Sequence, residues 1–294
     1  MLETTTFVIR GKDPRNAYLA KQLQAEGHRV ILQELLPDPA ARAFHIPSPC
    51  VLVLELHTPL HAVRPALESL SPGSACFAGR ISADDLSYAT NKGIFYYNLL
   101  DDNAFCIQNA IPTAEGALML ALQHTPFTIH NSTLLVIGYG RVGKAVARIF
   151  RACGCAVRVA SREISELADA YANSHSCIRL QELHLALRES DIVINTVPMR
   201  LLNAQLLKAL KKDTLIIELA SGTDNIDLAA ADALGLTVIK AGSLPGNTAP
   251  ATAAQYMKDA ILDRLTLFPN ENADKALSAA KENSIYDSAR KELL

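Results

Sequence analysis

Short apolar segments alternate with amphipathic stretches along the first third of the chain. The apolar segments occur in the sequences TFVIRG, HRVILQEL, CVLVLEL, SACFAGR and GIFYYNL, with turn residues between them. Helical patterns such as PRNAYLAKQLQAEG fill the intervals. This alternation predicts a parallel sheet whose strands are joined by crossover helices. The segment 37–49 contains four prolines and is therefore predicted to be a loop.

A second series of apolar segments follows, in the sequences STLLVIG, AVRVAS, SCIRL, DIVINTVP, TLIIELAS and LTVIKAG. Six strands with helices between them match the two mononucleotide-binding halves of a doubly wound sheet. The predicted fold class is therefore α/β with two domains. The first is a flavodoxin-like N-terminal α/β domain, and the second is a Rossmann doubly wound parallel sheet.

Two helical segments flank the second series, and we expect them to lie side by side as hinge helices. The first covers about 111–124, where Pro112 suits a first helical turn and Glu115 favours the positive end of a helix. The second is PGNTAPATAAQYMKDAILDRL, which returns the chain to the first domain. The polar segment after Asn270 is expected to pack on that domain or to fray. These boundaries predict one domain from 1–110, completed by 250–294, and a dinucleotide-binding domain from 111–249.

Length and charge narrow the class of function. A chain of 294 residues is long enough for two domains, each with its own core. Its 28 basic and 30 acidic side chains give a net charge of −2, which provides no electrostatic footprint for nucleic acid or an anionic membrane. No secretion signal or long apolar run is present, so we expect a cytoplasmic protein that acts on small molecules. The cysteines and histidines lack metal-binding spacings, so we expect reduced thiols and no metal.

The sequence VIGYGRVGKAVARIF contains a G-x-G-x-x-G motif. It follows a predicted strand and opens a predicted helix, which is the context that dinucleotide binding requires. Gly138 permits a tight turn, Gly140 lets the backbone approach a pyrophosphate, and Gly143 permits close contact between helix and strand. The alternative is a purely structural turn. The predicted cofactor contacts here are Gly138, Tyr139, Gly140, Arg141, Val142 and Gly143.

The end of the second strand in this domain decides between NAD and NADP. NAD requires an acidic residue there to receive the adenosine ribose hydroxyls. The chain instead has Ser161 and Arg162, and a hydroxyl with a guanidinium group suits a 2′-phosphate. Arg141 would assist. The sequence therefore favours NADP, with NAD as the alternative, because Glu163 follows directly.

The next two strands end in polar loops that we expect to line the nicotinamide side. Open α/β sheets bind ligands at the carboxyl ends of their strands. Capping a helix or a turn is the alternative role for each of these polar residues. The predicted contacts are Asn195, Thr196, Val197, Pro198, Ala220 and Ser221.

The turn after the first strand, G-K-D-P-R, is the main candidate for substrate binding in the first domain. Pro14 suits the first helical position, so Arg15 and the amides of the turn would face an anion. A solvated basic turn is the alternative. Arg80 and the helix entrance from Asn109 to Glu115 are further candidates. The predicted substrate contacts are Gly11, Lys12, Asp13, Arg15, Pro245 and Gly246.

The two-domain pattern resembles the D-2-hydroxyacid dehydrogenases, but their catalytic set is missing. Their arginine is expected just after the strand that ends in LAS, where this chain has Ser221, Gly222 and Thr223. Their histidine is expected in the loop AGSLPGNTAP, which contains none. General acid catalysis on a hydroxyl or carbonyl group usually requires such a histidine. The pattern therefore indicates this fold with different chemistry.

Three further segments resemble more closely the family formed by the A subunit of dipicolinate synthase. They are NAIPTAEGALMLALQHTPFTIHNSTLLVIGYGRVG, INTVPMRLLN and AGSLPGNTAPATAAQ, and the G-K-D-P-R turn adds to them. The resemblance implies oxidation of a dihydrodipicolinate-type precursor to dipicolinate during sporulation, with hydride transfer to NADP. It also implies that the partner is the flavoprotein-like B subunit of the enzyme, and we expect a homo-oligomer.

Within this resemblance, no strong acid or base is required, because aromatisation drives the reaction and the cofactor accepts the hydride. Arg15 and Lys12 would receive a carboxylate, while Asn109, Thr113 and Glu115 would orient the ring or accept its proton. Arg15, Asn109, Thr113 and Glu115 are the predicted catalytic residues. Two alternatives stay open: a D-2-hydroxyacid dehydrogenase relative with altered catalytic residues, and a non-catalytic NADP-binding protein.

Overall fold

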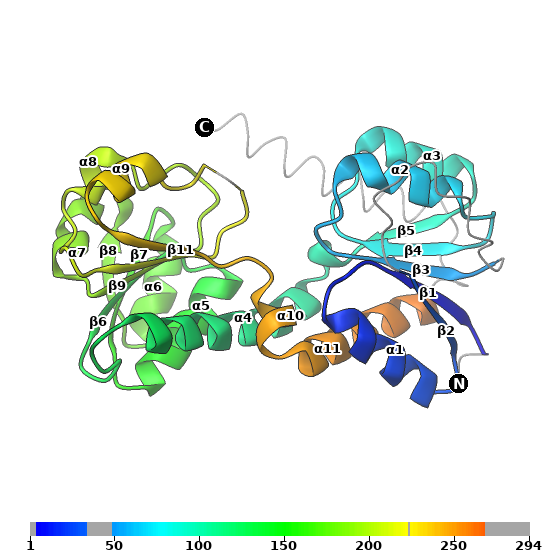
Figure 1. Ribbon diagram of the computed structural model, residues 1–294, viewed down its shortest axis with the longest axis horizontal. Coiled ribbons are helices and arrows are strands. Elements are labelled where there is room, and N and C mark those ends of the chain that lie inside the picture. The colour runs from blue at the N-terminus through cyan, green and yellow to red at the C-terminus, as the bar shows by residue number, and fades with distance from the viewer. Residues whose placement is uncertain (1–3, 34–48, 223, 268–294) are drawn as a thin grey trace. The chain divides into compact units, whose positions relative to one another are not determined.

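The computed structural model describes residues 4–33, 49–222 and 224–267, and it divides into two compact units (Figure 1). Unit 1 comprises residues 1–105 and 254–294, and unit 2 comprises residues 106–253. The domain boundaries expected from the sequence, at 110/111 and 249/250, stay a prediction. The predicted loop 37–49 lies almost wholly outside the described residues, as does the polar segment after Asn270.

Unit 1 contains a five-stranded parallel sheet in the order β2-β1-β3-β4-β5. This is the flavodoxin-like order, in which the direction of winding reverses between β1 and β3. The strands are β1 (Thr6–Arg10), β2 (Arg29–Gln33), β3 (Val51–Leu54), β4 (Ala75–Ala78) and β5 (Phe95–Asn98). The helices are α1 (Arg15–Ala25), α2 (Leu60–Glu68), α3 (Ala83–Asn91), the 3-10 turn η1 (Leu99–Asp101) and most of α11 (Pro250–Leu267).

Helices cover both faces of this sheet (Figure 1). Strands β3 and β4 are buried along their whole length, as expected of central strands in a parallel sheet. On one face, Leu52 and Cys76 pack against Val63 and Leu67 of α2. On the other face, α11 is tied to α1 by an ion pair between Lys258 and Glu26. The last helix therefore belongs to the fold of unit 1.

Unit 2 contains a six-stranded parallel sheet in the order β11-β10-β9-β6-β7-β8. This is the order of the dinucleotide-binding Rossmann fold, with its reversal between β6 and β9. Its strands are β6 (Thr133–Ile137), β7 (Ala156–Ser161), β8 (Ser176–Arg179), β9 (Ile192–Asn195), β10 (Leu215–Glu218) and β11 (Thr237–Lys240). Its helices are α4 (Asn103–His124), α5 (Arg141–Ala152), α6 (Ile164–Ala172), η2 (Leu180–Glu182), α7 (Leu183–Glu189), α8 (Ala204–Leu207), α9 (Leu228–Ala233) and α10 (Leu244–Thr248).

Alternate residues of β6 face two separate cores, because side chains alternate across a strand. Leu134 and Val136 belong to the core beneath α4 and α5. Leu135 and Ile137 belong to the core beneath α7, α8 and α9. Both sets are fully buried. The two parallel-sheet α/β domains predicted from the sequence are therefore confirmed, and the hinge role of α4 and α11 stays a prediction.

Helix α4 begins at Asn103, so the start predicted at about residue 111 is wrong. Asp102 provides the N-terminal cap, since its Oδ1 accepts a hydrogen bond from the amide of Phe105 at 2.9 Å. Pro112 lies inside the helix, where it lacks the amide that would bond four residues back. Thr113 Oγ1 donates to the carbonyl of Asn109 at 2.9 Å and supports the same turn. The family-specific residues 109–116 thus lie in mid-helix.

By length and composition, α4 is also apolar enough to cross a membrane, and no other helix in the described ranges is. Its alanines Ala110, Ala114, Ala117 and Ala121 pack into the core of unit 2. These alanines form the buried face of the helix, while Ile107 and Leu122 are exposed.

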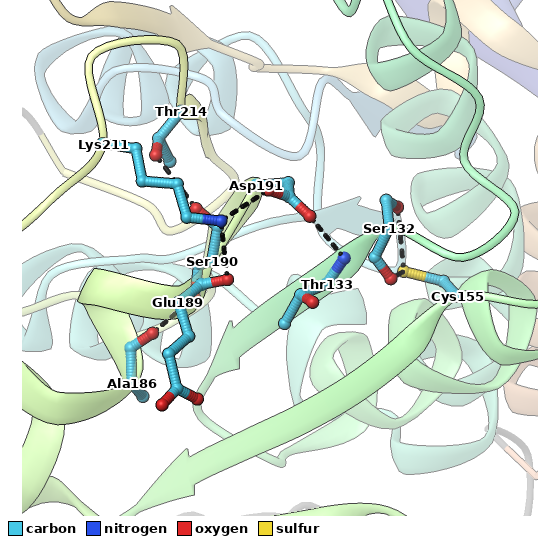
Figure 2. A network of polar contacts seen from close by, with 9 residues as sticks. All are labelled: Ser132, Thr133, Cys155, Ala186, Glu189, Ser190, Asp191, Lys211 and Thr214. Carbon is cyan, nitrogen blue, oxygen red and sulfur yellow. Dashed lines mark hydrogen bonds and ion pairs between the residues drawn. The ribbon is translucent and has the colours of Figure 1, made fainter.

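Polar contacts at the amino-terminal edge of the unit 2 sheet join successive strands (Figure 2). Asp191 precedes β9, and its carboxylate accepts hydrogen bonds from the amide of Thr133 at 2.8 Å and from Lys211 Nζ at 2.7 Å. Thr214 Oγ1 donates to the carbonyl of Ser190 at 3.0 Å. These contacts lie at the edge opposite to the carboxyl ends of the strands, so we assign them a structural role.

Candidate functional site

The glycine turn of unit 2 requires glycine at two of its three positions for packing reasons. Gly138 has a φ of +89°, and a Cβ there would lie 2.6 Å from Thr196 Oγ1. A Cβ at Gly143 would lie 2.2 Å from the carbonyl oxygen of Gly138. The backbone of α5 therefore runs directly against the end of β6. This is the close contact between helix and strand that the motif predicts.

Gly140 differs, because a Cβ there would meet nothing within 4 Å. The space in front of this residue is open. Helix α5 begins at Arg141 with no capping side chain and no acidic residue in its first turn. Its first amides are therefore available to an anion, with the positive end of the helix dipole behind them. A pyrophosphate fits this turn.

At the glycine turn, Tyr139 presents its backbone and not its side chain. Its side chain is buried in the core and meets His175 edge to face, with ring centres 5.9 Å apart. Its amide donates to Glu166 Oε2 at 3.3 Å. Any contact between Tyr139 and a cofactor would therefore have to use main-chain atoms.

The predicted 2′-phosphate corner contains a carboxylate that was not expected from the sequence. Ser161 is buried, and its hydroxyl donates to Glu166 Oε2 at 2.6 Å. Arg162 is exposed and pairs with its neighbour Glu163 at 3.1 Å. Glu166 comes from the first turn of α6 and reaches both the glycine turn and the end of β7. NADP would have to share this corner with the Glu166 charge.

A buried carboxyl group organises the loops after β9 and β10. Glu218 ends β10, where Oε2 accepts from Asn195 Nδ2 and Oε1 accepts from the amide of Ala220, both at 2.8 Å. Asn225 Nδ2 approaches Oε1 at 3.5 Å. Burial raises the pKa of Glu218, although these hydrogen bonds oppose the rise. Because all three partners are donors, the arrangement suits an ionised carboxylate.

The residues predicted on the nicotinamide side fall into two groups. Asn195 is fully buried, bonds Glu218, and exchanges hydrogen bonds of 3.2 Å with Val197. Thr196 Oγ1 donates to the carbonyl of Ile137 at 2.8 Å, so it closes the glycine turn. Pro198 and Ser221 are exposed. In this structure, Asn195 and Thr196 hold the loops in shape, while direct contact with a cofactor stays a prediction for all of them.

The two most family-specific segments of the sequence pack on each other within unit 2. A Cβ at Gly116 of α4 would lie 2.5 Å from Thr248 Oγ1 and 3.0 Å from Leu244 Cβ in α10. Pro245 and Gly246 of α10 are buried, and Glu115 of α4 is exposed. Glycine at 116 is therefore required for this packing.

Two polar atoms of these segments are buried without a hydrogen-bond partner in the described part of the chain. They are Asn109 Oδ1 and Thr248 Oγ1. Buried polar groups are nearly always paired, so an orphaned acceptor beside these motifs fits a ligand or an ordered water. This observation supports Asn109 as a candidate, and it adds Thr248, which was not expected from the sequence.

The G-K-D-P-R turn of unit 1 already holds a carboxylate. Glu55 Oε1 accepts hydrogen bonds from the amides of Lys12 and Asp13, the latter at 2.8 Å. Gly11 has a φ of +126°, and a Cβ there would lie 2.3 Å from Glu55 Oε1. These are the amides that were expected to bind a substrate anion. The side chain of Glu55 takes that place in the structure.

Arg15 is also engaged. Its side chain is 3% exposed and makes two hydrogen bonds to Asp13, from Nε at 2.8 Å and from Nη2 at 2.5 Å. The pKa of Asp13 is lowered because this pairing outweighs the effect of burial. The positive charge of Arg15 is therefore balanced locally by the carboxylate of Asp13. Its role in substrate binding stays a prediction.

Known proteins resemble this chain in sequence. Residues 114–241 match the NAD binding domain of the D-isomer specific 2-hydroxyacid dehydrogenases. The A subunit of dipicolinate synthase from Bacillus subtilis is 38% identical over 163 residues, which cover 55% of each chain. Glyoxylate reductase of Thermococcus kodakarensis is 29% identical over 101 residues, or 33% of this chain and 29% of the reductase. The chain thus matches about half the length of its first curated relative.

A solved structure extends the likeness. The A chain of dipicolinate synthase from Bacillus subtilis superimposes with a TM-score of 0.79 at 26% identity, covering 92% of this chain and 99% of that one. The fold of both units is therefore shared with it. The resemblance carried by the sequence motifs is confirmed: the chain is a homologue of the A subunit of dipicolinate synthase and contains the NAD(P)-binding domain of an oxidoreductase.

Proposed function

We propose that this chain is the part of a dipicolinate synthase that oxidises a dihydrodipicolinate-type precursor to dipicolinate, with hydride transfer to NADP, during sporulation. The observation that carries the proposal is the 38% identity to the A subunit of dipicolinate synthase. The packing of Gly116 on Thr248 supports it, because this contact joins the two most family-specific segments.

The chemistry asks little of the protein beyond positioning. Removal of a hydride and a proton from a dihydropyridine ring gives an aromatic product, and NADP supplies the hydride acceptor. The chain has to bind two carboxylates and hold the ring in one orientation. In our proposal, Lys12 and Arg15 attract a carboxylate in unit 1, while Asn109, Thr113 and Glu115 orient the ring.

The structure modifies how these residues would act. Arg15 is paired with Asp13, so a substrate carboxylate would have to share the guanidinium group of Arg15 with Asp13. Asn109 offers a buried acceptor without a partner in the described ranges, which suits a ring N–H group. Glu115 is exposed on α4.

The partner in this proposal is the flavoprotein-like B subunit of a dipicolinate synthase. The support is that the matched relative is the A subunit of its enzyme, a designation that implies a second component. We further propose that the chain works in the cytoplasm and forms a homo-oligomer.

The decisive experiment is purification of the chain with and without the B subunit of a dipicolinate synthase. Enzymatically generated dihydrodipicolinate is added with NADP, and NADPH absorbance is followed together with the pyridine product. Cofactor reduction in step with product formation is the expected result. Product formation without NADPH would show that the hydride goes elsewhere, and the chain would then be a non-catalytic NADP-binding protein.

A second candidate, reduction of simple 2-oxo acids, is favoured by the match of residues 114–241 to the 2-hydroxyacid dehydrogenase domain. The catalytic arginine and histidine of those enzymes have no counterpart at the places expected from the sequence, which are Ser221 to Thr223 and the loop 241–250. NADPH or NADH oxidation with glyoxylate or pyruvate tests this candidate directly.

A further inference from the structure

The carboxyl edge of the unit 2 sheet has two halves, which meet where the strand order reverses between β6 and β9. Strands β6, β7 and β8 form the first half, with the glycine turn and the predicted 2′-phosphate corner. Strands β9, β10 and β11 form the second mononucleotide-binding half, which receives the nicotinamide in this fold. We call the segments 195–198 and 219–222, which follow β9 and β10, the nicotinamide loops.

Glu218 lies at the base of both nicotinamide loops. It is the last residue of β10, and its side chain is 5% exposed. One carboxylate oxygen accepts from Asn195 Nδ2 at the end of β9, and the other accepts from the amide of Ala220 after β10, both at 2.8 Å. Asn195 in turn exchanges hydrogen bonds with the backbone of Val197. A single buried carboxylate therefore holds the two loops together.

The hydrogen-bond partners of Glu218 do not cancel its charge. The donors are neutral amide groups of Asn195, Ala220 and Asn225. Donors that face both oxygens favour the ionised carboxylate, which can only accept. Lys240 occupies the paired position on β11, but its side chain is exposed. Water and salt therefore screen the charge of Lys240 far more than that of Glu218.

The other carboxylates described beside the nicotinamide loops are balanced by a cation. Asp224 and Asp227 follow β10, and Arg200 from the loop after β9 pairs with both, at 3.3 Å and 3.8 Å. Asp227 also caps α9, where it accepts from the amide of Ala230 at 3.0 Å. Among the described residues of this half, Glu218 is therefore the carboxylate whose negative charge is buried and faces neutral donors.

A buried negative charge distinguishes the two redox forms of the cofactor. NADP⁺ and NADPH share the adenosine, the pyrophosphate and both riboses. The nicotinamide ring of NADP⁺ is a cation, while the dihydronicotinamide ring of NADPH is neutral. Two charges attract each other more strongly in the interior of a protein than in water. A carboxylate buried at the ends of β9 and β10 thus favours the oxidised form.

We propose that Glu218 makes the chain bind NADP⁺ in preference to NADPH, by placing a buried negative charge in the half of the dinucleotide site that receives the nicotinamide. This inference rests on the proposed function and deepens it, because it assigns the residue that selects the redox state of the cofactor. Glu218 acts at a distance and through the nicotinamide loops, so it is a positioning residue.

This preference suits a chain that works as an oxidase of its substrate. Each turnover in the proposed reaction leaves NADPH on the protein, and NADPH has to be replaced by NADP⁺ before the next one. The charge of Glu218 promotes that exchange. It opposes hydride uptake to the same extent, and formation of an aromatic product offsets this cost.

The test measures the Kd values of NADP⁺ and NADPH for the full chain by isothermal titration calorimetry. It is made at pH 8, because burial raises the pKa of Glu218 and high pH favours its ionised form. Glu218→Gln removes the charge, and Glu218→Asp retains it. Glu182→Gln, at an exposed glutamate of the same unit, is the matched control.

We expect Glu218→Gln to raise the Kd of NADP⁺ about tenfold relative to the Kd of NADPH. The ratio of the two Kd values should stay within about twofold of wild type in Glu218→Asp and Glu182→Gln. Disturbed loops would weaken both redox forms alike and leave the ratio unchanged, so the ratio separates the charge from a structural effect. Wild type alone provides a check without any variant, since its Kd for NADP⁺ should be the smaller of the two.

The outcomes distinguish this inference from the function on which it rests. A folded Glu218→Gln variant with the wild-type ratio overturns the role of Glu218 and leaves the proposed function intact. A wild type that binds NADPH more tightly than NADP⁺ overturns it as well, even if Glu218→Gln fails to fold. A wild type that binds neither form overturns the proposed function, and the role of Glu218 falls with it.

Discussion

Gly143 lies so close to Gly138 that a methyl group at 143 would sit 2.2 Å from the carbonyl oxygen of residue 138. This contact fixes the first turn of α5 against the end of β6. The adjacent Gly140 faces open space. The same motif therefore contains two glycines that the fold requires, Gly138 and Gly143, and one that a ligand would require.

Substitution of Gly143 and of Gly140 should have different effects. Gly143→Ala forces the backbone apart and should destabilise the protein by about 3 kcal/mol, the upper range for overpacking. Gly140 has a φ of −73°, which any residue adopts, so Gly140→Ala should leave the melting temperature unchanged. Its methyl group would occupy the pyrophosphate position and should weaken NADPH binding at least about tenfold, or ~1.4 kcal/mol.

Thermal unfolding and NADPH fluorescence titration measure the two effects on the same samples. A Gly140→Ala variant that binds NADPH as tightly as wild type would contradict the assignment of this turn to the pyrophosphate.

Glu166 should lower the affinity for NADP relative to NAD. Its carboxylate accepts from Ser161 Oγ and the amide of Tyr139, beside the predicted 2′-phosphate. Glu166→Gln removes a like charge worth about 1 kcal/mol at 4 Å in water, so the preference for NADPH over NADH should increase about fivefold. Glu182→Gln, at an exposed glutamate of the same unit, is the control. Equal titration curves for wild type and Glu166→Gln would place the 2′-phosphate elsewhere.

Glu218 should make the free energy of unfolding depend on pH, at pH values above the ordinary pKa of a glutamate. Burial raises its pKa above 4.5 in the folded state, so its contribution to stability is present below 4.5 and is lost as pH rises through the folded value. Glu218→Gln removes this slope. It also turns an amide donor toward Asn195 or Ala220, at a cost of about 1–3 kcal/mol at pH 7.

Denaturant unfolding at a series of pH values above 4.5 checks this expectation. Parallel curves for wild type and Glu218→Gln would contradict it. Glu163→Gln, at an exposed position, should follow wild type.

Asp191 should show the opposite pH dependence, since its contribution to the stability of unit 2 should fall as the pH falls. Although burial opposes it, the hydrogen bonds from Lys211 and Thr133 hold the pKa of Asp191 below 3.8. Its contribution is therefore present above pH 3.8 and is lost as pH falls through the lower folded value. Asp191→Asn should cost up to about 1 kcal/mol at pH 7, because the carboxamide oxygen can still accept from Thr133 while the ion pair with the exposed Lys211 is lost. Asp213→Asn, at an exposed aspartate nearby, is the control for urea unfolding at pH 7 and below pH 3.8.

The sequence predicted every strand of both sheets, because period and apolar character are local properties of the chain. It also predicted the separate roles of Gly138 and Gly143, since both follow from a motif of fixed spacing. The start of α4 was misplaced for a local reason as well. Pro112 was given more weight than the capping residue Asp102, and a helix can carry a proline in its interior when neighbouring contacts support it.

The carboxylates of the site were harder to predict, since their partners are distant in the chain. Glu55 meets amides 42 and 43 residues away, and Glu218 meets Asn195 at a separation of 23. Only the fold brings these groups together. A weak signal was present: Glu218 ends an apolar strand, and Glu55 follows one directly.

The engagement of Glu55 with the amides of Lys12 and Asp13 has a practical consequence for inhibitor design. Main-chain donors that are satisfied internally offer little to sulfate, phosphate or a small carboxylic acid fragment. Compounds directed at unit 1 should therefore not be designed as compact anions that bind the amides of this turn.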